Sequence, residues 1–277
     1  MNRYWKLVHL EVGRFRTMMA GLMALTLICQ VGAVIWGTAD ALSKRDPGST
    51  DAWKWLFLPN GKLSLALVIF HTRVLFILPI FLCIAALALY VFLIWYRDWI
   101  GGHTFIYRLL TLPTVRRHVY TAKATAIVLF VLVLLAFQLL LLVVENLIFN
   151  GMVPADLRES SSWPDLIDAS LVLAVLLPRH LDQFLWSYGL GITAVLAVFT
   201  AILLERSYRR LGILYAILYL AACCAAVVWP LAALGLGHPD AYLYPEEIAA
   251  IELAMEGLVL VASVWLGFRL IAKKVTV

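Results

Sequence analysis

Long stretches of the sequence carry no charged residue, and this feature limits the chain to a membrane-spanning fold. Between Arg16 and Asp40 lie 23 residues without a charge. A helix needs about 20 mainly apolar residues to cross the hydrocarbon core of a bilayer. The sequence therefore predicts an all-α integral membrane protein with six transmembrane helices, at about residues 17–38, 74–96, 122–145, 183–204, 211–234 and 249–272.

Composition agrees with this class. The chain is 64% hydrophobic and 14% charged, whereas a soluble domain is about half apolar and a quarter charged. Six crossings joined by short loops make one transmembrane domain over residues 1–277 and leave no room for a separate catalytic domain. The four cysteines lie inside apolar runs without metal-ligand spacing, so we expect neither disulfides nor a metal site.

Charge asymmetry predicts the topology. Of the 22 Lys and Arg residues, 15 fall in the terminal segments and in the loops that six crossings place on the same side as the termini. Loops rich in Lys and Arg face the cytoplasm, so both termini are predicted to be cytoplasmic. The acidic residues on that side are Glu11, Asp98 and Glu205. We interpret the basic pI as a topology signal and expect no nucleic-acid partner.

Two further segments are predicted to lie along the membrane surface. Residues 1–16 fit a basic amphipathic helix, whose apolar stripe comprises Tyr4, Leu7, Val8, Val12 and Phe15 and whose polar residues include Arg3, Lys6, His9 and Arg14. It is either a connecting helix or a simple anchor at the inner leaflet. The apolar run 169–177 is too short to cross a bilayer, so an interfacial or re-entrant helix is expected within an outer loop over 150–182. The first apolar run is too long for a cleaved signal peptide and is expected to remain as a helix.

The loop between the second and third spans carries the most specific pattern. Gly101 and Gly102 free the backbone to turn, Thr104 fits a helix N-cap, and Pro113 fits a helix end. In the intervening helix, Phe105, Leu109 and Leu112 fall on one apolar edge. That edge lies either on lipid or in a pocket of a partner protein.

This loop resembles the coupling helix of ABC-2-type permeases, the membrane-spanning subunits of one class of ABC transporter. The matching residues are Asp98, Gly101, Gly102, Thr104, Leu109, Leu110, Thr111, Leu112, Pro113, Arg116, Arg117 and Lys123. The chain departs from the common pattern at Thr114 and Val115, where a Ser-Arg pair often follows the proline. The resemblance implies contact with an ATPase through Gly101, Gly102, Thr104, Phe105, Leu109, Leu110, Thr111, Leu112, Pro113, Arg116 and Arg117.

The resemblance also implies the rest of the assembly. Two copies of a separate ABC ATPase would join two permease chains, as a homodimer or a heterodimer, in a plasma membrane that is bacterial or archaeal, most often bacterial. ATP hydrolysis would drive export or flipping of a hydrophobic or amphipathic substrate, such as a peptide antibiotic, a drug or a lipid. The only Gly-Lys pair, Gly61-Lys62, is followed by Leu and makes no phosphate loop. ATP and Mg²⁺ are therefore expected in the partner, with no cofactor, metal or catalytic residue in this chain.

Other function classes remain open from the residues alone. A secondary transporter or a membrane sensor would need no ATPase, and the loop helix would then lie on lipid. A membrane-embedded enzyme would need polar residues that converge within the spans, and the first five spans hold almost none. Four charges near span ends are candidates for a transport pathway or an outer mouth: Arg73, Glu145, Glu252 and Glu256. In a charged outer mouth, Arg73 is predicted to pair with a carboxylate.

Overall fold

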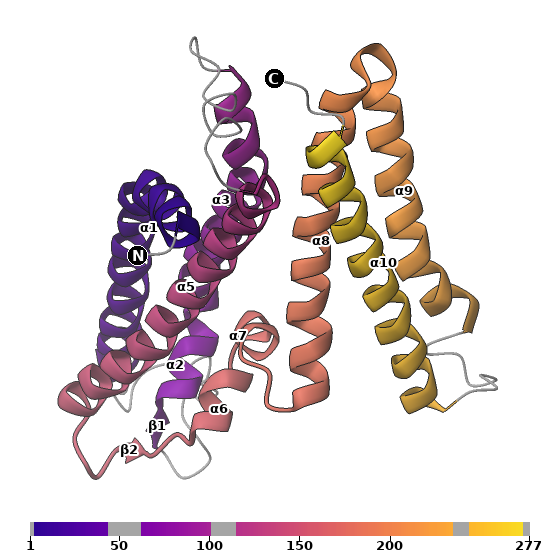
Figure 1. Cartoon of the computed structure of the whole chain (residues 1–277). Coiled ribbons are helices and arrows are strands. Elements are labelled where there is room, and N and C mark those ends of the chain that lie inside the picture. Colours follow the sequence, from indigo (N-terminus) through magenta and orange to yellow (C-terminus); the bar gives the residue numbers. More distant parts are fainter. Residues whose placement is uncertain (1–2, 44–61, 101–114, 235–243, 274–277) are drawn as a thin grey trace. The chain divides into compact units, whose positions relative to one another are not determined.

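The computed structural model describes residues 3–43, 62–100, 115–234 and 244–273. Within them lie six long helices, each long and apolar enough to cross a membrane. This confirms an all-α membrane protein with six candidate spans, apart from two short strands. In chain order (Figure 1) the elements are α1 (Arg3–Ser43), β1 (Leu63–Ser64), α2 (Leu65–His71), α3 (Arg73–Ile100), α5 (Arg117–Met152), β2 (Arg158–Glu159), α6 (Trp163–Asp168), α7 (Leu171–Leu176), α8 (Leu181–Ser207), α9 (Arg209–Leu234) and α10 (Pro245–Lys273).

The N-terminal segment differs from the expectation of a separate surface helix. α1 is a single helix of 41 residues, so the amphipathic segment and the first span are continuous. Leu7, Val8 and Phe15, which form part of the apolar stripe, are buried within the protein. The same face carries Glu11, which is also buried. Glu11 forms ion pairs with Arg97 of α3 and Lys123 of α5. This face of α1 therefore packs against other helices.

The chain divides into two compact units. One unit comprises residues 15–87 and 129–179. Its core joins α1, α2, α3 and α5 through one cluster of buried apolar side chains, and Gln30 and Gln138 form a hydrogen bond of 3.0 Å between α1 and α5. The cluster includes Ala33, Val34, Leu65, Ile69, Phe76, Leu142 and Phe149.

The connection after α5 contains only short elements. Its strand, β2, pairs in parallel with β1, the strand that precedes α2, and Leu63 lies opposite Arg158. Ser162 and Asp165 form a capping box at the start of α6, each side chain accepting from the other residue's backbone N–H. α7 has six residues, or about 9 Å of helix, which is too short to cross a bilayer. This agrees with the predicted lack of a crossing at 169–177.

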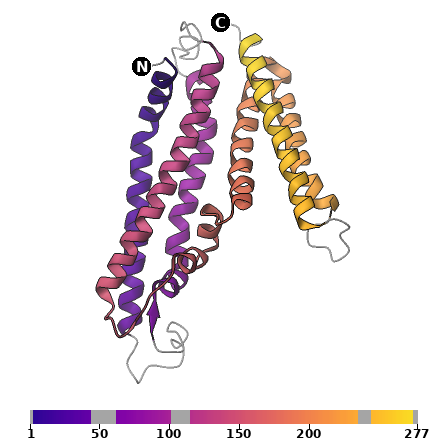
Figure 2. The ribbon, with the colours of Figure 1, turned by 60° about the horizontal axis from the view of Figure 1, so that its bottom comes forward.

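The other unit comprises residues 1–14, 88–128 and 180–277. In this unit α8 and α10 run in the same direction. Trp186 donates to Glu252 near the start of the two helices, and Thr200 donates to the Ser263 carbonyl farther along both of them. α9 packs against both helices, and Tyr219 of α9 reaches Ser263 with an O···O distance of 2.6 Å. Figure 2 shows these three helices side by side. The ends of α1, α3 and α5 that belong to this unit contain the candidate site.

Candidate functional site: a buried ion-pair cluster

A cluster of five charged side chains joins α1, α3 and α5. Its centre is Lys123 of α5, which is only 1% exposed. The Lys123 ammonium lies 2.8 Å from Glu11 Oε1 of α1 and 2.5 Å from Asp98 Oδ2 of α3. It also donates to the Ile94 carbonyl at 2.7 Å. Three helices therefore meet at one cation.

Two arginines complete the cluster. Arg14 bonds to Asp98 at 2.9 Å, and Arg97 bonds to Glu11 at 3.1 Å. Their side chains are 26% and 37% exposed, so they reach toward the surface while the two carboxylates stay buried. The cluster holds three cations and two anions. We call these residues, Glu11, Arg14, Arg97, Asp98 and Lys123, the ion-pair cluster.

One aromatic ring, that of Trp95, lies against Lys123. The Trp95 ring lies 5.3 Å from the ammonium and is fully buried. Trp95 contacts Tyr120 of α5 and Phe199 of α8 edge-on or tilted, with ring centroids 6.3 and 5.5 Å apart. Tyr120 in turn contacts Phe268 of α10 at 5.6 Å. The cluster is thus linked to α8 and α10 through packed rings.

The C-terminal end of α8 is also tied to α3. Tyr96 donates a hydrogen bond to Glu205, the last acidic residue of α8. The Arg206 guanidinium lies over the rings of Tyr96 and Trp99, at 5.2 and 5.7 Å. All three acidic residues of the predicted cytoplasmic side are therefore engaged by partners on α3 or α5.

The cluster lies at the end of α3 and the start of α5, the two helices that flank residues 101–116 in the sequence. Asp98 is two residues before the end of α3, and Lys123 is six residues after the start of α5. Nine of the predicted ATPase-contact residues lie outside the described residues: Gly101, Gly102, Thr104, Phe105, Leu109, Leu110, Thr111, Leu112 and Pro113. Of the other two, Arg116 is partly exposed and Arg117 lies over the Phe268 ring at 5.5 Å.

Sequence reasoning found two members of the cluster and missed three. Asp98 and Lys123 were among the residues that match the coupling segment, whereas Glu11, Arg14 and Arg97 counted only toward topology. A signal was present, because acidic residues are rare on that side and an unpaired carboxylate inside an apolar helix is costly. Each of the three acids there needed a cation or donor on another helix.

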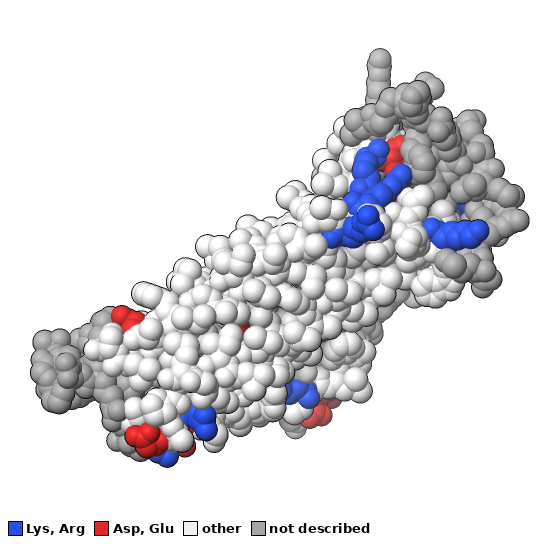
Figure 3. Space-filling model, turned by 90° about the vertical axis from the view of Figure 1, so that its left-hand side faces the viewer, with Lys and Arg blue, Asp and Glu red and all other residues white. Residues whose placement is uncertain are grey.

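The four candidate pathway charges fall into different environments. Arg73 is exposed and lies 5.5 Å from the Phe70 ring centre, and it makes no ion pair within the described part of the chain. Glu145 is fully buried and both its oxygens lack a hydrogen-bond partner there. Figure 3 shows one face that is mostly uncharged, with the larger group of Lys and Arg side chains toward one end and charged side chains of both signs toward the other. The predicted pairing of Arg73 with a carboxylate at an outer mouth stays a prediction.

Glu252 and Glu256 belong to α10, and their carboxyl groups contact α8. The Trp186 indole donates to Glu252 at 2.7 Å. Glu256 is 3% exposed, and its carboxyl group fills the space beside Gly189, where a Cβ would overlap with Oε1. Among the described residues, no group of three or more His, Cys, Asp or Glu side chains could hold a metal ion.

Comparison with known proteins adds no family assignment. No family model, no curated protein and no solved structure matches the chain.

Proposed function

We propose that this chain is the membrane-spanning permease subunit of an ABC transporter of the ABC-2 type. The observation that carries the proposal is the ion-pair cluster at the base of the loop of residues 101–116. A coupling segment has to pass force from a moving ATPase to transmembrane helices. It can do so only if the helices that hold it move together with it.

The cluster supplies such a rigid base. α3 and α5 hold the two ends of the loop, and the shared contact with Lys123 binds both of them to α1. Pulling Lys123 away from Glu11 and Asp98 would leave buried unpaired charges, which costs about 3–5 kcal/mol. A push on the loop therefore moves three helix ends as one body. Packed rings continue from Trp95 and Tyr120 to α8 and α10.

The proposed assembly follows from the resemblance. The cluster end of α1, α3 and α5 would face the cytoplasm, together with both termini, in a bacterial plasma membrane. Two ATPase subunits would bind there and supply ATP and Mg²⁺. Two permease chains, identical or homologous, would expose a shared path to a hydrophobic or amphipathic substrate such as a peptide, a drug or a lipid.

Copurification from native membranes in mild detergent tests this proposal. The wild-type chain is compared with a double variant in the loop, Leu109→Asp with Leu112→Asp. A matched control carries Leu56→Asp with Leu58→Asp, which places the same charges in the segment predicted to lie outside. We expect a nucleotide-binding ATPase to copurify with the wild type and with the control, and to be lost from the loop variant.

Two results would contradict the proposal. If no nucleotide-binding protein accompanies the wild type, the loop helix lies on lipid, and a secondary transporter or a membrane sensor becomes the better account. If the ATPase is lost equally from both variants, its attachment does not run through the loop.

A further inference from the structure

A hollow with two arginines lies where the start of α5 meets the end of α10. It is lined by Arg117, Trp265, Phe268, Arg269 and Ala272 and has a volume of about 520 Å³. The Arg117 guanidinium lies over the Phe268 ring at 5.5 Å, and the Arg269 guanidinium lies over the Trp265 ring at 5.3 Å. Each guanidinium group thus lies against an aromatic face of the hollow, a contact that Arg makes without using its N–H donors.

These two cations differ from those of the ion-pair cluster. Both side chains are exposed, and neither forms a salt bridge with a carboxylate within the described residues. Two guanidinium groups that line one hollow without a carboxylate make a site for an anion, and phosphate is an anion that Arg recognises well.

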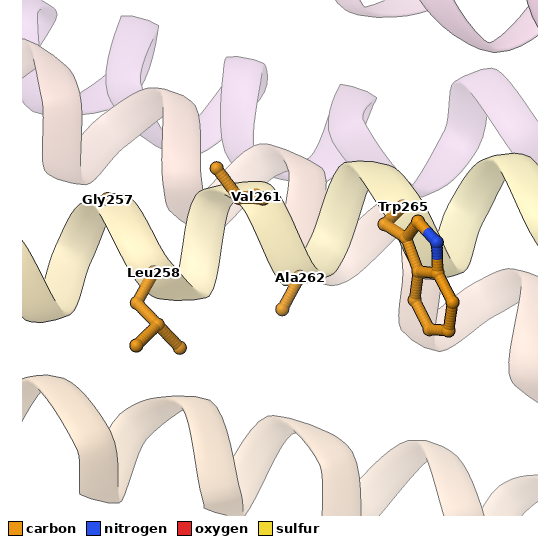
Figure 4. A pocket seen from close by; sticks show the side chains of 5 residues that line it. All are labelled: Gly257, Leu258, Val261, Ala262 and Trp265. Carbon is orange, nitrogen blue, oxygen red and sulfur yellow. The ribbon is translucent and has the colours of Figure 1, made fainter.

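An apolar groove continues from this hollow along α10. It has a volume of about 490 Å³ and is lined by Gly257, Leu258, Val261, Ala262 and Trp265, which Figure 4 shows along successive turns of the helix. Trp265 lines both the groove and the arginine hollow. The two hollows therefore share one wall, with charge at one end and apolar surface at the other.

The length of the combined hollow matches one leaflet of a bilayer. From Gly257 to Arg269 is 12 residues of helix, or about 18 Å. Half of a hydrocarbon core is about 15 Å. A molecule with an anionic head at Arg117 and Arg269 would therefore place an apolar tail of leaflet length along the groove.

We propose that this hollow binds an anionic phospholipid, with the headgroup phosphate between Arg117 and Arg269 and one acyl chain along the Gly257–Trp265 face of α10. The charge asymmetry predicts that this end of α10 lies on the cytoplasmic side, where headgroups of the inner leaflet would meet it. Basic pockets between transmembrane helices recognise anionic headgroups in this way. The site does not depend on the proposed permease function, because lipid binding needs no ATPase.

Native mass spectrometry of the full chain in detergent tests the site. The probes are phosphatidylglycerol and phosphatidylcholine with the same acyl chains, and soluble glycerol phosphate as a headgroup without a tail. We expect phosphatidylglycerol to bind about tenfold more tightly than phosphatidylcholine, because two arginines face its unbalanced charge. Glycerol phosphate at the same concentration should not displace it.

Variants separate the two parts of the site. Arg117→Gln with Arg269→Gln should abolish the preference for phosphatidylglycerol, and Ala262→Leu should weaken binding of both lipids by filling the groove. Arg73→Gln is the matched control, since Arg73 also lies over a ring, that of Phe70, at 5.5 Å. It should leave the preference unchanged.

Four outcomes would overturn the proposal. They are equal binding of the two lipids by the wild type, a preference that persists in Arg117→Gln with Arg269→Gln, loss of the preference in Arg73→Gln as well, and displacement by glycerol phosphate at matched concentration. The first and fourth need no variant, so a variant that fails to fold does not affect them.

Discussion

Removal of the central cation of the ion-pair cluster is the most informative perturbation. Lys123→Met keeps the length and the apolar stem of the side chain but deletes the ammonium. Glu11 and Asp98 then lose contacts of 2.8 and 2.5 Å, and their side chains are 4% and 1% exposed. Breaking a buried ion pair from one side costs about 3–5 kcal/mol, since the remaining charge stays buried. Arg14 and Arg97 still contact the two carboxylates, so we expect the lower end, about 3 kcal/mol.

The chain offers a matched control for this change. Lys62 also pairs with a carboxylate, Glu159, at 3.5 Å, but the two side chains are 43% and 38% exposed. An exposed pair contributes about 0–1 kcal/mol, so Lys62→Met should change the free energy of unfolding by less than about 1 kcal/mol. Reversible unfolding by sodium dodecyl sulfate in mixed micelles, followed by circular dichroism, measures both variants.

A double-mutant cycle shows whether the loss arises from the cluster. Glu11→Gln removes one of the two buried charges that Lys123→Met leaves behind. The double variant should therefore cost less than the sum of the single variants, by about 1–3 kcal/mol. The reasoning is refuted if Lys123→Met costs no more than Lys62→Met, or if the two changes add without coupling.

Two further predictions concern packing and pH. Gly267→Ala should destabilise the protein by about 1–3 kcal/mol, because a Cβ there comes within 2.9 Å of the buried Tyr120 ring, whereas Gly191→Ala, with open space around it, should be neutral or stabilising in the same unfolding assay. Hydrogen bonds from the Ser162 hydroxyl and backbone N–H hold the pKa of Asp165 below its usual range. The stability that this capping box adds to α6 is thus complete above the ordinary aspartate pKa and is lost as the pH falls through the lowered pKa. The protection factors of the amides in residues 163–168, which are exchange rates corrected for the intrinsic effect of pH, should fall over that acidic window, and in Asp165→Asn they should show no such step.

The spans were predictable because each depends on local composition. A window of about 20 apolar residues has few alternatives to a membrane helix, and α9 lies over the predicted 211–234 almost unchanged. Helix ends were less predictable. α5 extends from Arg117 to Met152, well past the predicted 122–145, because polar residues can continue a helix beyond the hydrocarbon core. α1 likewise continues through both predicted N-terminal segments.

The ion-pair cluster could not be predicted from sequence patterns, because the two residues of each main pair are far apart in the chain. Glu11 and Lys123 are 112 residues apart, and no periodicity relates them. The sequence did contain the imbalance that requires such pairs, namely three acids on a basic side. Which cation each acid meets depends on how α1, α3 and α5 pack. The apolar edge of Phe105, Leu109 and Leu112 lies outside the described residues, so its partner stays a prediction.

Site-specific photo-crosslinking in living cells tests the central claim most directly. A photoreactive phenylalanine analogue replaces Tyr107, in the middle of the proposed coupling segment, and in a second strain it replaces Trp55, in the segment predicted to lie outside. The account predicts a crosslink from position 107 to a protein that binds ATP, and none to that protein from position 55. A crosslink from position 107 to lipid alone, or to the same protein from both positions, would contradict it.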